Sequence, residues 1–118
     1  MKDPLKRFSV NIVKSAKLAA NRKVPDNRDA ACLAAEYDTD YPPTSVIITY
    51  RNEPRSTLLR TVVSVLERSP DKLVKEIILV DDNNVDSDIG TELGTIKKIC
   101  LARNVRREGL IRSRILAI

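Results

Sequence analysis

The second half of the chain carries a regular succession of apolar runs and helical stripes. Residues 45–50 form a nearly continuous β-branched run, which predicts a strand buried on both faces. The next apolar residues recur at the i, i+3, i+4, i+7 spacing of an amphipathic helix; they are Leu59, Val62, Val63 and Leu66. Pro54 suits the first turn of this helix, and Pro70 closes its far end.

The same succession continues toward the last residue. Residues 76–80 predict a second buried strand, and a polar loop with a helical turn at 88–93 follows it. Residues 96–102 predict a third strand, and residues 109–116 predict the start of another helix. Because alternating strands and helices favour crossover connections, the pattern predicts an α/β half-domain of the nucleotide-binding type, with parallel strands and flanking helices.

The first 43 residues are mixed and alanine-rich instead. Residues 10–20 have roughly helical spacing, and Ser9 suits the N-cap of that helix. Residues 24–28 break it, and Tyr41-Pro42-Pro43 predicts a stiff, extended linker into the first strand. The sequence therefore divides into an N-terminal extension, residues 1–43, and a regular α/β unit, residues 44–118.

Composition narrows the chemistry. The 118 residues include no histidine, which excludes Ser-His-Asp and Cys-His catalysis and imidazole metal ligands. The net charge is +5, but 21 basic residues are mixed with 16 acidic ones, and there are only three tyrosines, one phenylalanine and no tryptophan. A nucleic-acid-binding function is therefore disfavoured, because stacking side chains are scarce and no polybasic run is present.

Polar residues follow each predicted strand, where ligands bind in open parallel sheets. They occupy residues 49–53, 81–84 and 103–107. The acid pair Asp81-Asp82 can accept hydrogen bonds from ribose hydroxyls or base N–H groups, and an arginine opposite can clamp a phosphate. There is no G-x-G-x-x-G and no P-loop motif, so a metal ion or basic side chains would have to hold a diphosphate.

Each of these features also has a structural alternative. Asp81-Asp82 can form an Asx turn or a helix cap, and Thr49 can be an ordinary β-branched strand residue. A set of nearby arginines can be a solvated basic face; they are Arg103, Arg106, Arg107, Arg112 and Arg114.

Several ordered blocks resemble the polypeptide N-acetylgalactosaminyltransferases. These blocks are PTSVIITYRNE at 43–53, STLLRTVVSV at 56–65, KEIILVDD at 75–82 and REGLIRSR at 107–114. The similarity extends back through residues 24–28 and covers most of the chain. Residues 86–94 and Arg103-Asn104 are most similar to the second isoenzyme of that family.

The resemblance implies a Rossmann-like GT-A fold and a retaining transfer of GalNAc from UDP-GalNAc to Ser or Thr of proteins, which initiates mucin-type O-glycosylation. It implies Mn²⁺ at the donor diphosphate, and a Golgi type II membrane protein whose catalytic domain faces the lumen. Matched by motif, Thr49, Asp82 and Arg107 would contact UDP-GalNAc, and Asp81 would support that site. Tyr50 stands where the family has a phenylalanine and would offer an aromatic face, while Arg51 replaces a histidine.

The resemblance also implies what this chain lacks. The family's Asp-x-His metal motif is expected beyond Ile118, so no metal ligand and no catalytic residue is expected within the chain. Residues 1–43 would be a stem-proximal extension, and residues 44–118 would be the nucleotide-sugar-binding first half of a truncated GT-A domain. We therefore expect the uridine half-site without transfer activity; the alternative is a non-catalytic module that binds UDP or a partner protein.

Three further expectations concern the chain outside that site. The basic start, Met1 to Arg7, is followed by no apolar stretch, and no run is long enough for a membrane anchor, so no targeting signal is expected.

Cys32 and Cys100 fit no C-x-x-C spacing and could be bridged or free. The resemblance implies that Cys32 is unpaired here; Cys100, at a strand centre, is expected to be buried. Exposed strand edges and helix faces should favour association.

Overall fold

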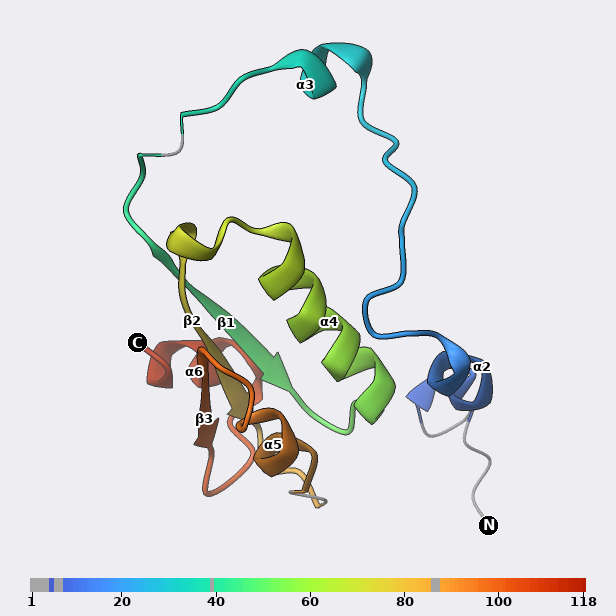
Figure 1. The fold of residues 1–118 in the computed structure, drawn as a ribbon. Helices are drawn as coiled ribbons and strands as arrows, with labels where there is room; N and C mark the ends of the chain where they lie inside the picture. Colours follow the sequence, from blue (N-terminus) through green and yellow to red (C-terminus); the bar gives the residue numbers. More distant parts are fainter. Residues whose placement is uncertain (1–4, 6–7, 39, 86–87) are drawn as a thin grey trace.

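The computed structural model describes residues 5, 8–38, 40–85 and 88–118, which include a parallel three-stranded sheet with helices on both faces (Figure 1). The strands are β1 (Thr44–Tyr50), β2 (Val74–Asp81) and β3 (Ile99–Arg103), in the order β1-β2-β3. Tyr50 pairs with Asp81, and Asp81 pairs with Arg103. The register therefore brings the three carboxyl ends to one edge of the sheet and confirms the predicted parallel α/β arrangement.

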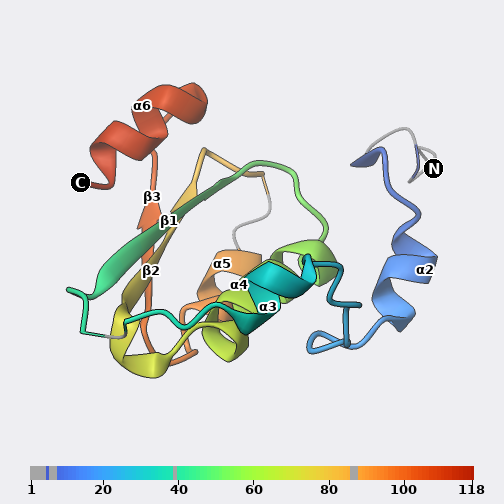
Figure 2. The same cartoon turned by 90° about the horizontal axis from the view of Figure 1, so that it is seen from above.

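The helices lie on opposite faces of this sheet (Figure 2). The chain leaves β1 through α4 (Arg55–Arg68) and the 3₁₀ turn η1 (Asp71–Leu73), then runs through α5 (Asp88–Leu93) between β2 and β3. These helices cover one face, and α6 (Gly109–Leu116) covers part of the other and packs against β1. Pro54 is the N-cap residue of α4 and stands one position before the predicted first turn.

The core lies between the sheet and α4 and α5. Val62 of α4 and Ile77 and Leu79 of β2 have no exposed surface, and Leu58 and Leu93 are 3% and 1% exposed. Burial of each such side chain contributes about 1.5–3 kcal/mol relative to exposure. The apolar stripe of α4 is thus the core-facing side, as its spacing predicts.

Two strands differ from the expectation. Residues 46–49 of β1 are half-buried rather than buried on both faces, because β1 is an edge strand among the described residues. The third strand begins at Ile99 rather than Ile96, because Ile96 closes a turn after α5 and Lys98 has a φ of 69°. A left-handed residue cannot continue a strand, so the ladder starts immediately after it.

The described residues of the N-terminal extension include two short helices, α2 (Ile12–Lys17) and α3 (Ala30–Ala34). Asn11, not Ser9, caps α2: its side chain accepts a hydrogen bond from the backbone N–H of Lys14, whereas Ser9 has a φ of 54°. Between α2 and β1 the chain swings away from the sheet and carries α3 at its far point (Figure 1). Residues 1–4, 6–7, 39 and 86–87, which fall in this extension and in the polar loop, lie outside the described residues.

The described part of the chain contains no helix that is both long and apolar enough to cross a bilayer. It does expose apolar side chains along α6, namely Leu110, Ile111, Ile115 and Leu116. The expected association of the chain through such surfaces stays a prediction.

The prediction that Cys100 is buried is wrong. Cys32 and Cys100 are both free and exposed, so no bridge joins them. Cys100 pairs with Ile78 in the β-ladder and contacts Glu76 with its thiol, 3.5 Å from Sγ to Oε2. These residues lie on the face of the sheet that α6 covers only in part, so a central position in the strand does not bury the thiol.

Candidate functional site

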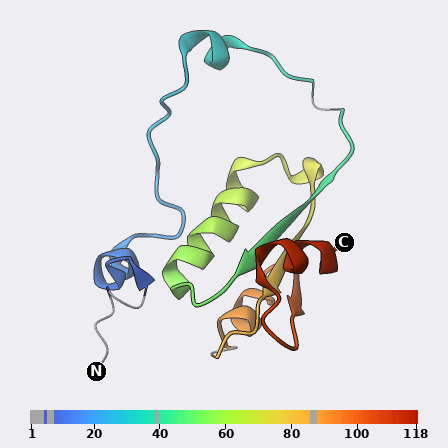
Figure 3. The same ribbon diagram turned by 180° about the vertical axis from the view of Figure 1, so that it is seen from behind.

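A cleft of about 230 Å³ lies at the carboxyl-end edge of the sheet. It brings together Thr49 from β1, Asp82 after β2 and Arg107 before α6, three residues that the sequence places in one site. Seen from behind, α6 lies over the sheet beside the ends of the strands (Figure 3). The other residues along the cleft are Tyr50, Arg51, Glu53, Gly109, Leu110 and Ser113.

The Asp82 carboxylate anchors the start of α6. Its Oδ1 accepts hydrogen bonds from the backbone N–H of Glu108 at 2.7 Å, the Asn104 amide at 3.0 Å and the Ser113 hydroxyl at 3.3 Å. Its Oδ2 accepts one hydrogen bond, from the backbone N–H of Gly109 at 3.1 Å. These donors, the Glu108 N–H foremost, hold the pKa of Asp82 below its ordinary value despite burial.

The capping alternative for Asp82 is therefore realised, and it leaves room for a ligand. A carboxylate oxygen can accept two hydrogen bonds, so Oδ1 is saturated while Oδ2 keeps one acceptor direction. Because Asp82 lines the cleft and is 5% exposed, that direction is available only to a group inside the cleft.

Asp81 has a supporting position behind the cleft. Its Oδ1 accepts hydrogen bonds from the backbone N–H and the side-chain amide of Asn84, at 2.7 and 2.8 Å, which is an Asx-type turn. Arg103 lies 3.8 Å from its other oxygen and donates to the Asn84 carbonyl at 2.8 Å. Asp81 thus shapes the loop after β2 and does not reach the cleft itself.

The turns after β1 and β2 are joined by hydrogen bonds next to the cleft. Asn52 and Asn83 have φ values of 53° and 57°, a left-handed conformation that asparagine tolerates better than most residues. The backbone N–H of Asn52 donates to the Asn84 side chain, and the Arg51 guanidinium donates to the Asp82 carbonyl at 2.8 Å. Arg51 is thereby tied to the loop after β2.

Three polar side chains in the cleft have no partner among the described residues: Thr49, Arg107 and the exposed carboxylate Glu53. The Thr49 hydroxyl makes no hydrogen bond there, and the exposed Arg107 guanidinium makes neither a hydrogen bond nor an ion pair. An unpaired hydroxyl and an unpaired guanidinium, beside the acceptor on Asp82, can bind a polar anion through complementary hydrogen bonds.

Tyr50 does not present an open aromatic face. It is 5% exposed and belongs to the core, and its hydroxyl has no hydrogen-bond partner among the described residues. Burial, together with the nearby charge of Asp81, raises the pKa of Tyr50 to about 12. Its ring packs in the core, with the hydroxyl beside Gly90 of α5, and leaves little surface for stacking.

The described residues do not form a metal site. They contain no group of three His, Cys, Asp or Glu side chains that could hold an ion. The two aspartates nearest the cleft already bind donors from the protein: Asp82 has one acceptor direction left, and Asp81 is turned to Asn84 and Arg103. A divalent ion prefers several oxygen ligands, so this donor set does not fit one by itself.

Three buried polar residues of the site received no individual role from the sequence: Asn84, Asn104 and Ser113. Asn84 and Asn104 lie in the polar stretches 81–84 and 103–107 that the sequence marks after its strands. Ser113 lies on α6, where nothing local marks it, yet it has no exposed surface and binds both Asn104, at 2.8 Å, and Asp82.

Comparison with known proteins agrees with this geometry. A family model described as glycosyl transferase family 2 matches residues 45–118, more than half of the chain. Human polypeptide N-acetylgalactosaminyltransferase 14 is 50% identical over 113 residues, which are 96% of this chain and 20% of that protein. The mouse inactive polypeptide N-acetylgalactosaminyltransferase-like protein 5 is 42% identical over 95% of this chain and 27% of its own length.

A solved structure has the same fold. The crystal structure of GalNAc-T7 with UDP, GalNAc and Mn²⁺ superposes with a TM-score of 0.88 at 36% identity, covering 95% of this chain and 22% of that one. The chain spans about a fifth of the length of human transferase 14 and of GalNAc-T7. These matches confirm the GT-A-type fold and the resemblance found in the sequence blocks: the chain belongs to glycosyl transferase family 2 and is similar to the catalytic region of the polypeptide N-acetylgalactosaminyltransferases.

Proposed function

We propose that this chain is the donor-nucleotide-binding part of a polypeptide N-acetylgalactosaminyltransferase. The whole enzyme would transfer GalNAc from UDP-GalNAc to Ser or Thr of proteins, in the lumen of the Golgi. Within it, residues 44–118 would form the nucleotide-sugar-binding half, and residues 1–43 would be the preceding extension. The observation that carries the proposal is the cleft in which Thr49, Asp82 and Arg107 meet.

Each of the three residues would have a distinct role. The free acceptor direction on Asp82 Oδ2 suits a ribose hydroxyl or the N–H of uracil. The Thr49 hydroxyl can donate or accept a hydrogen bond at the same end, and the Arg107 guanidinium suits the diphosphate. A cleft of about 230 Å³ is below the roughly 300–1,000 Å³ typical of ligand pockets, which agrees with contact to part of the donor only.

The remaining chemistry would come from outside the described residues. In the whole enzyme, Mn²⁺ would act as a Lewis acid on the diphosphate leaving group. GalNAc-T7 was crystallised with that ion. Because the aspartates here do not form a site for it, we assign no step of transfer to this chain and expect none from it.

Titration of the chain with UDP tests the proposal. We expect weak, saturable binding by NMR, with shifts at the ends of β1 and β2. Arg107→Ala should lower the affinity about tenfold, because it removes a charge-assisted contact to phosphate. Arg114→Ala is the matched control: it removes an exposed arginine from the same region without touching the cleft, and should change the affinity less than twofold. No UDP binding at millimolar concentration, or equal effects of the two variants, would refute the site.

A non-catalytic module that binds UDP or a partner protein is the second candidate, and similarity to a relative named as inactive favours it. The coding sequence past the codon for Ile118 separates the two. A reading frame that continues into an Asp-x-His motif supports the transferase. Transfer of GalNAc to a threonine peptide by the chain alone with Mn²⁺ would contradict the assignment of transfer to other parts of the protein.

A further inference from the structure

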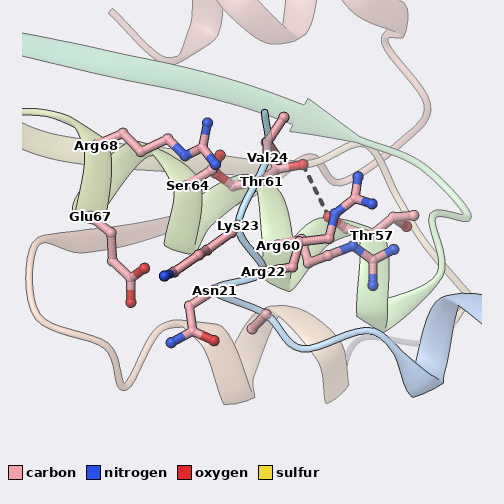
Figure 4. Close-up of a pocket in the computed structure, with 11 residues that line it drawn as sticks. Asn21, Arg22, Lys23, Val24, Thr57, Arg60, Thr61, Ser64, Glu67 and Arg68 are labelled. Atoms are coloured by element: carbon pink, nitrogen blue, oxygen red, sulfur yellow. Dashed lines mark hydrogen bonds between the residues drawn. The ribbon is translucent and has the colours of Figure 1, made fainter. Parts of the chain in front are cut away.

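A second and larger groove, of about 560 Å³, lies between α4 and the segment 20–24, which follows α2 (Figure 4). We call it the α4 groove. Four cationic side chains line it, from Arg22 and Lys23 on the segment and from Arg60 and Arg68 on α4, against one carboxylate, Glu67. It lies on the side of α4 that faces away from the sheet, whereas the cleft of Arg107 lies beside α6.

The periodicity of α4 explains this groove. Leu58 and Val62 turn the apolar stripe toward the sheet, so the opposite side of the helix collects the polar residues between Thr57 and Arg68. The hydroxyls on that side donate back to the helix: Thr61 to the Thr57 carbonyl at 3.0 Å and Ser64 to the Thr61 carbonyl at 2.8 Å. The charge of the groove therefore comes from the arginines and the lysine.

Most of that charge is not neutralised by the protein. Arg22, Lys23 and Arg68 have no ion pair and no side-chain hydrogen bond among the described residues, and only Arg68 interacts electrostatically with a carboxylate, that of Asp26, which is itself paired with Arg28. Arg60 keeps its charge but is held in place, because its guanidinium donates to the Ser15 carbonyl at 2.7 Å and to the Ser15 hydroxyl. Several unpaired cations on one concave surface attract an anion.

The shape of the groove favours a peptide as the source of that anion. Arg60 and Arg68 are eight residues apart on α4, or about 12 Å along the helix axis. This is the length of three to four residues of extended chain, so acidic side chains at alternate positions can reach both ends. The other wall offers backbone partners as well: Lys23 and Val24 make no backbone hydrogen bond in the described structure.

We propose that the α4 groove binds an extended acidic peptide segment. Carboxylates at alternate positions would pair with Arg68 at one end and with Arg22 and Arg60 at the other. The peptide backbone would take up the unpaired N–H and C=O groups of Lys23 and Val24. This site is separate from the nucleotide cleft and does not depend on it.

A fluorescent hexapeptide with glutamate at every second position is the probe, titrated with the full chain and followed by polarisation. We expect saturable binding that weakens as salt is raised. The same peptide with glutamine in place of glutamate should not bind. Excess UDP should leave the binding unchanged, because UDP would occupy the other side of the molecule.

The double variant Arg22→Gln/Arg68→Gln should lower the affinity by at least about tenfold. Lys97→Gln/Arg114→Gln removes the same net charge from exposed residues outside the groove and should lower it less than twofold. Equal losses in the two double variants, displacement by UDP, or no binding at millimolar peptide overturns the proposal. Tighter binding of a sulfated hexasaccharide through the same arginines overturns the assignment to a peptide.

Discussion

Asp82 accepts a hydrogen bond from the backbone N–H of Glu108 at 2.7 Å, across 26 positions of sequence. This contact joins the end of the central strand to the residue that precedes α6. With the Gly109 N–H at 3.1 Å, it satisfies two of the backbone donors that a helix start leaves without an internal partner. The residue proposed to bind the donor therefore also holds the helix that forms one wall of the cleft.

Asp82→Asn should destabilise the chain. An amide can offer one oxygen but not two, so either the Glu108 or the Gly109 N–H would face an NH₂ group. We expect a loss of about 1–3 kcal/mol in the free energy of unfolding, measured by urea denaturation. Glu67→Gln, at an exposed carboxylate without a partner among the described residues, should change it by less than about 0.5 kcal/mol. A fully stable Asp82→Asn chain would show that this contact does not secure α6.

The same contacts predict an acid dependence. The pKa of Asp82 is lowered from 3.8 chiefly by the Glu108 N–H, and the pKa of Glu108 is lowered chiefly by its hydrogen bond from Arg106. Folded-state pKa values below the unfolded ones stabilise the fold above the unfolded pKa, and this stability is lost as the pH falls through the folded values. The stability gap between wild type and Asp82→Asn should therefore narrow as the pH falls below about 4. A gap that stays constant from pH 7 to pH 3 would contradict this.

The fold was predictable because local periodicity and global packing agree. The stripe through Leu59 and Val62 and the β-branched run at 45–50 each match the element that forms. The predictions that differ from the structure concern burial, which depends on neighbouring elements that the local sequence does not indicate. Strand β1 is half-buried because it is an edge strand here, and Cys100 is exposed because α6 covers only part of its face of the sheet.

The site was predictable in its position but not in its bonding. Strand ends mark Thr49 and Asp82 in the sequence, since the carboxyl ends of parallel strands share one edge. Nothing local indicates that Asp82 would bind Ser113, 31 positions away, or that Asp81 would turn to Asn84 instead of the cleft. These pairings depend on the path of α6 over the sheet, which is a tertiary property.

Gly90 of α5 and Tyr50 of β1 should be energetically coupled. A Cβ at position 90 would clash with the Tyr50 hydroxyl oxygen and would lie 3.0 Å from the Leu101 side chain. Because Tyr50 is buried and rigid, Gly90→Ala should cost about 1–3 kcal/mol, although alanine is the better helix former.

Tyr50→Phe removes the oxygen that would clash, and that oxygen has no hydrogen-bond partner among the described residues. Alone, this change should cost little. In the double variant it should recover at least about 0.5 kcal/mol of the loss, with the Leu101 contact limiting the recovery. The free energies of unfolding of the wild type, the two single variants and the double variant, measured by thermal unfolding, give the coupling energy. Strict additivity would show that Gly90 and Tyr50 do not compete for the same space.

The two cysteines should react independently and without reductant. Both thiols are exposed and unbridged, so alkylation of the folded chain should add two labels by mass spectrometry. The pKa of Cys100 is raised chiefly by its contact with the Glu76 carboxylate, which lowers its thiolate fraction at neutral pH. Glu76→Gln should therefore speed alkylation of Cys100 a few-fold and leave Cys32 unchanged, whereas Glu67→Gln should affect neither. A chain that takes up no label until reduced would contain a disulfide and contradict this structure; an unchanged Cys100 rate in Glu76→Gln would remove the carboxylate as the cause.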